Sequence, residues 1–394
     1  MIMAKKVEKS TEELTLPEKL AKIRQQINKV NTSAGKVVAG FLNDKEIADS
    51  LTVKYLPTPN DDLNEAIGGG FPIGRTTIIT GNPDSGKTSL ALETIGQAMN
   101  REGNEDFTCL WLESENSLEL NYIIDTFHID PNRFIVVEVN MKEGGEAALD
   151  QCASLLRTGT FNMFVINSMK ALIPKTQLNK AIAEDTVALQ ARMNTKALSQ
   201  YLSIIHEHNI IFVIIQHLST LIGNLSRDPY SLSGGLFLRY GGSIILDCRK
   251  QTVLDTDPIT KEEGQKYMIS VKKNHVCPKI YPYVKVPHYI IYGEGTEVVL
   301  TTLRKAIDQG ILRASGAWIF WDDKELKWNG KAAFREDMKK NPNILQTLRN
   351  MVYGNVDKLT KEEMRELNIS EVDIAVDKEI NPSIDLDQEA DTVE

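Results

Sequence analysis

The chain has 394 residues, a net charge of −9 and the composition of an ordinary globular protein. Its length suits one large α/β core with small appendages, and its four scattered cysteines lack the C-x-x-C spacing of a zinc site or a disulfide framework. Because no segment is apolar enough to span a membrane and none resembles a secretion signal, we expect a cytoplasmic protein.

The negative charge is concentrated at the C-terminal end. Residues 356–394 contain 13 Asp and Glu against 4 Lys and Arg, which leaves 41 acidic and 41 basic residues in the preceding part of the chain. The acidity is therefore a property of the tail, and it does not exclude a basic, DNA-facing surface on the core.

The N-terminal region predicts one helix ahead of the core. Residues 1–15 are polar, and Leu16–Val30 places Leu20, Ile23 and Ile27 on one helical face after Pro17. This helix has nothing of its own to bury against, so it either folds back or docks on a neighbouring subunit. A short strand is expected at Gly35–Phe41.

The middle of the chain alternates between apolar strands and helices. The predicted strands are Arg75–Thr80, Thr108–Glu113, Phe134–Val139, Met163–Ser168 and Ile210–Gln216. Helices are expected from Ser89 and over Val187–His206. This alternation predicts an α/β fold with a mostly parallel, doubly wound or related sheet.

The remaining elements suggest a small α+β module after the core. Further strands are predicted at Ser243–Asp247, Tyr267–Lys272 and Ile280–Val286, and the module at Leu303–Gln309, Trp318–Trp328 and Ala332–Tyr353. The polar segment 217–235 is long for a connection inside a domain, which favours a functional or disordered loop. We divide the chain into an N-terminal arm (1–50), a core (51–298), a C-terminal domain (299–355) and a tail (356–394).

The core is organised around one glycine-containing loop, which fits the pattern G-x-x-x-x-G-K-[ST] between a strand and a helix. Its residues are Gly81, Asn82, Pro83, Asp84, Ser85, Gly86, Lys87 and Thr88, followed by Ser89. Backbone N–H groups and the helix N-terminus would hold phosphates there. Lys87 would reach the β- and γ-phosphates and Thr88 would ligate Mg²⁺, so a nucleotide and Mg²⁺ are the expected ligands of this loop.

Several motifs occur in one order along the chain. They include Gly70-Phe71-Pro72-Ile73-Gly74-Arg75, Trp111-Leu112-Glu113-Ser114-Glu115, Ala171-Leu172-Ile173-Pro174-Lys175, Gln190-Ala191-Arg192-Met193, Lys272-Lys273-Asn274, Tyr292-Gly293-Glu294-Gly295 and Ala314-Ser315-Gly316-Ala317-Trp318. In these motifs the chain resembles bacterial RecA recombinases and their divergent phage relatives from about Pro17 to Tyr353.

The resemblance implies a RecA-like P-loop ATPase core, with an N-terminal helical oligomerisation arm and a small C-terminal α+β domain. It implies an ATP-dependent helical filament on single-stranded DNA that pairs with a homologous duplex and exchanges strands. ATP would lie between subunits, and a single-strand-binding or mediator protein is a further expected partner. The location would be a bacterial cytoplasm or an infected host cell.

The resemblance also assigns roles at the nucleotide site. Glu115 matches the glutamate that orients the attacking water, while Glu113 either assists the metal shell or caps its strand. Gln216 matches the γ-phosphate sensor that orders the loop after it, and Lys273 matches a lysine that reaches a neighbour's γ-phosphate. The predicted catalytic residues are therefore Lys87, Glu115, Gln216 and Lys273.

Contacts to the base and to DNA follow in the same way. Tyr122 matches the residue that stacks on adenine, with Glu119 near the exocyclic amine, although aromatic residues at helical spacing more often belong to a core. Residues 177–186 resemble the first DNA-binding loop of RecA. The predicted DNA contacts are Arg192, Leu221, Ile222 and Arg227, and the second loop is one residue longer than in RecA.

Two positions depart from the family pattern. Asn167 stands where RecA has an Asp that holds Mg²⁺ through water, and a neutral amide brings no charge to the cation. His275 replaces the second lysine that reaches the neighbour's phosphate, and it is only partly charged near neutral pH. Both residues remain predicted nucleotide contacts, and Asn167 a predicted metal contact.

These departures leave two alternatives to a hydrolysing recombinase. One is a slow or non-hydrolysing ATP-gated protein that coats single-stranded DNA. The other is a RecA-fold ring helicase or helicase loader, against which the N-terminal helix and the C-terminal module argue. The acidic tail either competes with DNA for a basic groove or only keeps the protein soluble.

Overall fold

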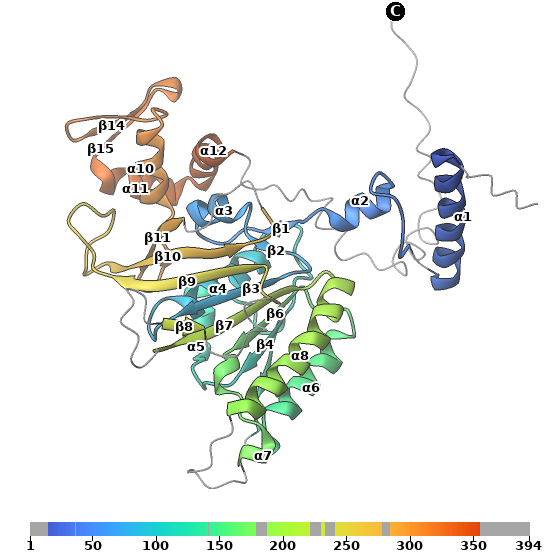
Figure 1. The fold of residues 1–394 in the computed structure, drawn as a ribbon. Coiled ribbons are helices and arrows are strands. Elements are labelled where there is room, and N and C mark those ends of the chain that lie inside the picture. The colour runs from blue at the N-terminus through green and yellow to red at the C-terminus, as the bar shows by residue number, and fades with distance from the viewer. Residues whose placement is uncertain are drawn as a thin grey trace, which may run out of the picture. The chain divides into compact units, whose positions relative to one another are not determined.

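The computed structural model describes residues 15–35, 37–140, 142–178, 187–220, 230–232, 241–277 and 284–354. The chain divides into two compact units, Met1–Val53 and Lys54–Glu394. The second unit contains the sheet and the C-terminal helices that Figure 1 shows. Among the helices of the described residues, none combines the length and the apolar character that a membrane crossing requires.

The first unit contains α1 (Leu16–Ala34) and α2 (Lys45–Leu51). Glu18 closes a capping box by accepting a hydrogen bond from Thr15 N at 2.8 Å, which satisfies an N–H group that the helix leaves without a partner. The predicted strand at Gly35–Phe41 was wrong, because residues 37–41 form no strand. Their backbone is bound instead by the Asn31 side chain, which accepts from Val38 N and Ala39 N at 3.0 Å each.

The second unit is built on one mostly parallel sheet. Its strand order is β12-β11-β10-β9-β3-β7-β6-β4-β5, with β8 paired to β7. The parallel strands are β3 (Thr76–Gly81), β4 (Cys109–Glu113), β5 (Phe134–Glu138), β6 (Met163–Asn167), β7 (Ile211–Thr220) and β9 (Ile244–Gln251). The antiparallel strands are β8 (Tyr230–Leu232), β10 (Gly264–Asn274), β11 (Lys285–Ile291) and β12 (Gly295–Thr296). The α/β prediction is confirmed.

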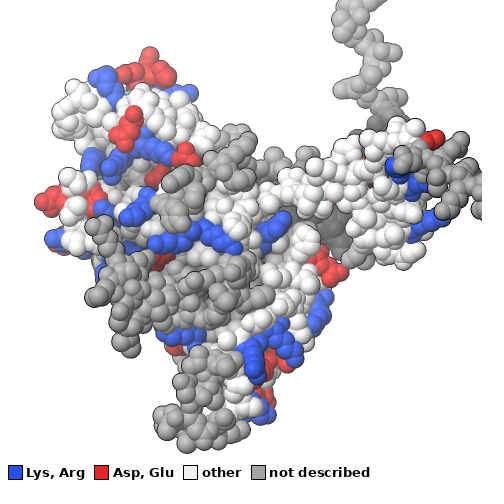
Figure 2. Space-filling view, viewed as in Figure 1, with Lys and Arg blue, Asp and Glu red and all other residues white. Residues whose placement is uncertain are grey.

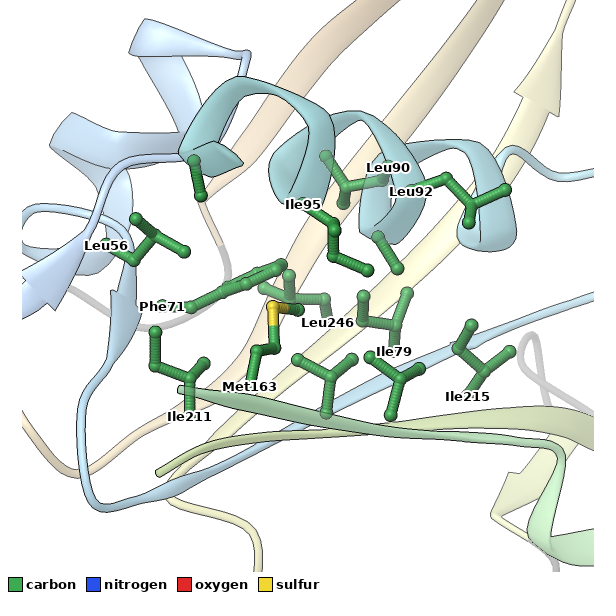
Figure 3. Packing of buried hydrophobic residues seen from close by; sticks show 14 of the residues in the cluster. Leu56, Phe71, Ile79, Leu90, Leu92, Ile95, Met163, Ile211, Ile215 and Leu246 are labelled. Carbon is green, nitrogen blue, oxygen red and sulfur yellow. The ribbon is translucent and has the colours of Figure 1, made fainter. Parts of the chain in front are cut away.

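Helices cover both faces of this sheet. Alternate residues of each strand point to opposite faces, so Ile79 belongs to one apolar cluster and Ile78 to the other. The first cluster includes residues of α4 (Lys87–Met99) and α5 (Leu120–Phe127), and the second includes residues of α6 (Gly145–Leu156) and α8 (Val187–Glu207). Figure 3 shows Leu90 and Ile95 of α4 packed above Ile79 and Leu246. Burial on both faces explains the apolar runs of β4, β6 and the first half of β7.

Short elements complete the core around these layers. They are β1 (Tyr55–Leu56), α3 (Asp61–Ile67), β2 (Phe71–Pro72), the 3-10 turn η1 (Met169–Ala171) and α7 (Lys175–Leu178). The strand predicted at Ile280–Val286 begins only at Lys285 and continues to Ile291, and residues 278–283 lie outside the described part of the chain. Pro287 fits inside β11 because its neighbours carry the pairing with β10.

The C-terminal elements have a core of their own. They comprise α10 (Val299–Asp308), β13 (Arg313–Ser315), β14 (Trp318–Trp321), the 3-10 turn η2 (Asp322–Lys324), β15 (Leu326–Asn329), α11 (Gly330–Lys340) and α12 (Pro342–Tyr353). Leu303, Trp321 and Phe334 are buried together in this cluster. It is joined to the preceding fold by Arg349, which donates to both oxygens of Asp61 at 2.8 Å.

Candidate nucleotide-binding site

The glycine loop joins β3 to α4, as its pattern predicts. Gly81 passes so close to β9 that a Cβ there would lie 2.3 Å from the Cys248 carbonyl oxygen. Gly86 has a φ of +79° and lies against the ring of Tyr267, where a Cβ would meet ring atoms at 3.3 Å. Both positions therefore require glycine, and the loop can bring its backbone close to a bound group.

Lys87 is a buried cation at the start of α4. Its Nζ donates to the Asn82 carbonyl oxygen at 2.6 Å and to Ser85 Oγ at 3.3 Å. Burial lowers the pKa of Lys87, and this effect outweighs the nearby Cys248, Glu115 and Asp84, which raise it. The amine lies over its own loop, where an anion would stabilise its charge.

The carboxyl ends of four strands meet beside this loop. The register pairs Glu113 with Asn167 across β4 and β6, and Gly81 with His217 across β3 and β7. Because parallel strands end at the same edge of a sheet, their polar last residues form one site at the loop. The sequence analysis predicted Glu113 and Asn167 at such an edge and named Gln216 as the residue of β7 in the site.

Glu115 lies at the centre of this edge. One of its oxygens, Oε1, lies 2.9 Å from Nε2 of His217, and the same oxygen accepts a hydrogen bond from Ser168 Oγ. Gln216, the predicted sensor, is fully buried, and its neighbour His217 makes the contact to Glu115. Sequence reasoning missed His217 and Ser168, although both follow the last apolar residues of predicted strands.

Glu113 and Asn167 form a buried pair behind Glu115. Asn167 donates through Nδ2 to Glu113 Oε2 at 3.1 Å and to Ser117 Oγ at 3.0 Å. Glu113 also accepts from Trp111 Nε1 at 2.9 Å and from Glu115 N at 2.7 Å. The carboxylate of Glu113 thus fixes both the side chain of Asn167 and the backbone that carries Glu115.

The predicted base contacts lie at the start of α5. Glu119 caps this helix by accepting from Asn121 N at 3.1 Å and Tyr122 N at 2.6 Å, while the Tyr122 side chain is 47% exposed. Burial raises the pKa of Tyr267 to about 12, and Tyr292, Tyr122 and Asp84 lie near enough to add to that rise. Exposed tyrosine therefore borders the loop, whereas the carboxylate of Glu119 is already engaged by its helix.

Lys273 and His275 lie at and just after the end of β10, beside the start of β9. β10 runs antiparallel to β9 and pairs Lys273 with Ile245, whereas Gly81 of the phosphate loop pairs with Cys248, further along the same strand. Burial lowers the pKa of Lys273, and the His275 side chain is exposed.

The predicted DNA contacts are described only in part. Arg192 is exposed on α8. Leu221, Ile222 and Arg227 lie outside the described residues, as does most of the first loop, residues 179–186. Within the part of the chain that the structure covers, no group of three or more His, Cys, Asp or Glu side chains could hold a metal ion.

The comparisons with known proteins identify the family of the chain. The family model for the RecA N-terminal domain matches residues 21–297. The chain belongs to the RecA family. Protein RecA of Chlorobaculum tepidum is 30% identical over 343 residues, which cover 86% of this chain and 94% of that protein. Protein RecA of Clostridium novyi is 28% identical over 337 residues, with 85% and 91% covered, and that of Heliobacterium modesticaldum is 28% identical over 342 residues, with 86% and 94% covered.

Membership of the RecA family explains the order of elements around the loop. The matched range begins within α1 and ends after β12, so it spans the whole sheet. Of the two positions that depart from the predicted family pattern, Asn167 lies at the end of β6 within this strand-end site, whereas His275 follows β10. The roles of individual residues are taken up below as proposals.

Proposed function

We propose that the chain is an ATP-dependent DNA recombinase that forms filaments on single-stranded DNA and exchanges strands with a homologous duplex. The observation that carries this proposal is the shared strand edge, where Lys87, Glu115 and His217 meet at the phosphate loop. β7 continues from this edge to Thr220 and so contains the first residues of the segment predicted as the second DNA loop, 217–235, of which residues 230–232 form β8 instead of a loop. One strand therefore links the nucleotide site to the DNA site.

In this function the chain's own residues bind ATP and activate water. The loop N–H groups and Lys87 hold the triphosphate, and Glu115 accepts a proton from the attacking water. Mg²⁺ would be held by Thr88 and, through water, by Asn167, and it would neutralise charge on the phosphates. The buried Oδ1 of Asn167, an acceptor without a hydrogen-bond partner among the described residues, fits such a water.

We further propose that His217, rather than Gln216, reports the state of the nucleotide to the DNA loop. His217 contacts Glu115 directly, and Leu218 after it pairs with Leu232 of β8. A shift of Glu115 toward a bound γ-phosphate would break or strengthen the His217 contact and so move the start of the loop.

Lys273 and His275 would act on the nucleotide of a neighbouring subunit. Their place beside the start of β9, away from the strand ends that meet at the phosphate loop, supports this proposal, because a head-to-tail assembly can bring that part of one copy to the phosphate loop of the next. A cation acting there would stabilise the transition state in the manner of an arginine finger.

A surface for the next copy lies along β5, at the end of the strand order. An apolar groove of about 350 Å³ beside it is lined by residues that include Leu120, Ile124, Phe134 and Val136. The apolar side chains of α1, such as Leu20 and Ile23, are exposed within their own unit. We propose that the N-terminal arm of a neighbouring copy covers this groove.

DNA would approach the face that Figure 2 shows. Lys and Arg side chains predominate over the core on this face, although the whole chain is acidic. Such a surface attracts the phosphate backbone irrespective of its sequence. In this role the protein works in the cytoplasm of a bacterium or of an infected host cell.

The test is ATP hydrolysis at saturating Mg²⁺ with and without single-stranded DNA, together with strand exchange between homologous DNAs. We expect DNA-stimulated turnover, exchanged product and filaments in electron micrographs, all lost in Lys87→Ala. Tight ATP-dependent DNA binding without turnover would favour a gated coating protein, for which Asn167 is the motivating observation. Rings without filaments would favour a helicase or loader.

A further inference from the structure

Hydrogen bonds fix the orientation of the Asn167 side-chain amide, at the position that departs from the family pattern. Nδ2 donates to two acceptors on the β4 side, Glu113 Oε2 at 3.1 Å and Ser117 Oγ at 3.0 Å. Asn167 is fully buried, and its Oδ1 has no hydrogen-bond partner among the described residues. Because the amide is planar, Oδ1 points away from Glu113 and Ser117.

A buried acceptor without a partner is unfavourable, so its presence in a site indicates a ligand that donates. Asn167 ends β6, and α4, which begins with Lys87 and Thr88, packs across β3, β7 and β6. The donor that fits this place is the hydration water of a cation bound between Thr88 and the phosphates.

Glu113 decides this orientation because a carboxylate only accepts hydrogen bonds. Four donors surround it: Trp111 Nε1, Asn167 Nδ2, Glu115 N and Ser117 N, the last at 3.4 Å. If position 113 carried an amide, its NH₂ would need an acceptor. Asn167 would then turn its oxygen toward position 113 and its NH₂ toward the cation.

We propose that Glu113 is a positioning residue that makes Asn167 present an oxygen, so that a neutral amide serves the Mg²⁺ water in place of the carboxylate found in RecA. This inference rests on the proposed ATP site. Glu113, behind the metal shell, then carries the single negative charge of the pair, whereas Asn167, which faces the water, is neutral.

One consequence is that Asn167→Asp by itself does not improve the metal site. An aspartate there would place a carboxylate oxygen where Nδ2 now lies, 3.1 Å from Glu113 Oε2, and the two charges would repel. The exchanged pair, Glu113→Gln with Asn167→Asp, keeps one donor, one acceptor and one charge between the two positions, although Trp111 Nε1 loses the acceptor that it has in Glu113. In that pair the introduced glutamine amide would donate to the introduced aspartate, which would face the water with its other oxygen.

The experiment measures Mn²⁺ binding to the ADP-bound protein by electron paramagnetic resonance, with no reliance on turnover. The variants are Glu113→Gln, Asn167→Asp and the exchanged pair. The control is Glu138→Gln, which removes an exposed carboxylate from the end of the neighbouring strand β5. Binding of a fluorescent ADP analogue and thermal melting are followed in parallel.

We expect Glu113→Gln to weaken Mn²⁺ binding at least about tenfold, the scale of losses when a residue that orients a metal ligand is changed. The exchanged pair should return to within about threefold of the unmodified protein, and Glu138→Gln should match it. If Glu113→Gln does not fold, the other two variants test the inference, which requires Asn167→Asp to bind Mn²⁺ more weakly than the exchanged pair.

Unchanged Mn²⁺ affinity in folded Glu113→Gln would overturn the inference. So would an exchanged pair that binds no better than the folded single variants. Failure of the unmodified protein to bind the ADP analogue would instead overturn the proposed ATP site, so the two failures are distinguishable.

Discussion

The imidazole Nε2 of His217 lies 2.9 Å from the Oε1 atom of Glu115. Glu115 follows β4 and His217 lies near the end of β7, so the contact joins two strands that are not neighbours in the sheet. Ser168, which follows the intervening strand β6, donates to the same oxygen. Three strand ends thus converge on the carboxylate that we propose as the general base.

Removing the His217 contact should weaken the response to DNA. We expect His217→Ala to lower DNA-stimulated ATP turnover about tenfold, the value of one hydrogen bond to a charged group. His217→Gln should recover part of this loss because its amide can still donate. His206→Ala, at an exposed position of α8, is the control in the same hydrolysis assay. Unaltered stimulation in His217→Ala would rule out the proposed link.

Glu115→Gln should abolish hydrolysis and spare nucleotide binding. The amide keeps the size of the side chain but cannot accept a proton from water, and such losses reach about 10²–10⁴-fold. Single-turnover hydrolysis and binding of a fluorescent ATP analogue measure the two quantities separately. A variant that still turns over ATP at the original rate would show that another residue activates the water.

The ion pair between Arg349 and Asp61 should contribute strongly to stability. The Asp61 side chain is 3% exposed, so Arg349→Ala would leave a buried carboxylate without its partner, at a cost of about 3 kcal/mol. Arg313→Ala is the control, because its ion pair with Asp322 is exposed to solvent and should contribute much less to stability. Urea denaturation followed by circular dichroism compares them, and equal losses would contradict the argument.

Stability should fall on mild acidification because of His288. This side chain is fully buried beside Asn60, whose Nδ2 lies 3.2 Å from the His288 Nδ1 atom, and burial lowers the pKa of His288 from 6.5 to about 4. Between these two values the unfolded chain binds a proton that the folded chain does not, so the free energy of unfolding decreases as pH falls through that window.

The loss should approach about 3 kcal/mol near pH 4, from about 1.4 kcal/mol for each pKa unit. Urea midpoints at pH 7, 6 and 5 measure it for the unmodified protein and for His288→Asn, whose amide does not titrate. A pH dependence equally steep in the variant would assign the effect to other groups.

The fold and the loop could be predicted because their signals are local. A β-branched run, a glycine loop and a helical pattern follow one another at β3 and α4, and continuous apolar strands mark a sheet buried on both faces. The prediction of a strand at Gly35–Phe41 was wrong because a strand needs a neighbouring strand to pair with. Among the described residues of that unit, the Asn31 side chain accepts the backbone hydrogen bond of Ala39 instead.

The site could be predicted less well because it depends on register. Gln216 and His217 are adjacent in sequence, and only the pairing with β3 shows that His217 stands beside Gly81 and reaches Glu115. The position of Lys273 beside Ile245 likewise follows from the antiparallel pairing of β10 with β9, which no single-sequence pattern reveals. The division of the chain into domains and the DNA contacts remain predictions.

The continuity of β7 has a thermodynamic consequence. β7 carries both His217 and residues 218–220 of the predicted DNA loop, so it is the element through which the proposed ATP and DNA sites would be coupled, and thermodynamic linkage makes any such coupling reciprocal. If ATP raises the affinity for single-stranded DNA by some factor, DNA raises the affinity for ATP by the same factor. Two binding titrations, each with the other ligand saturating, should therefore give one and the same coupling free energy.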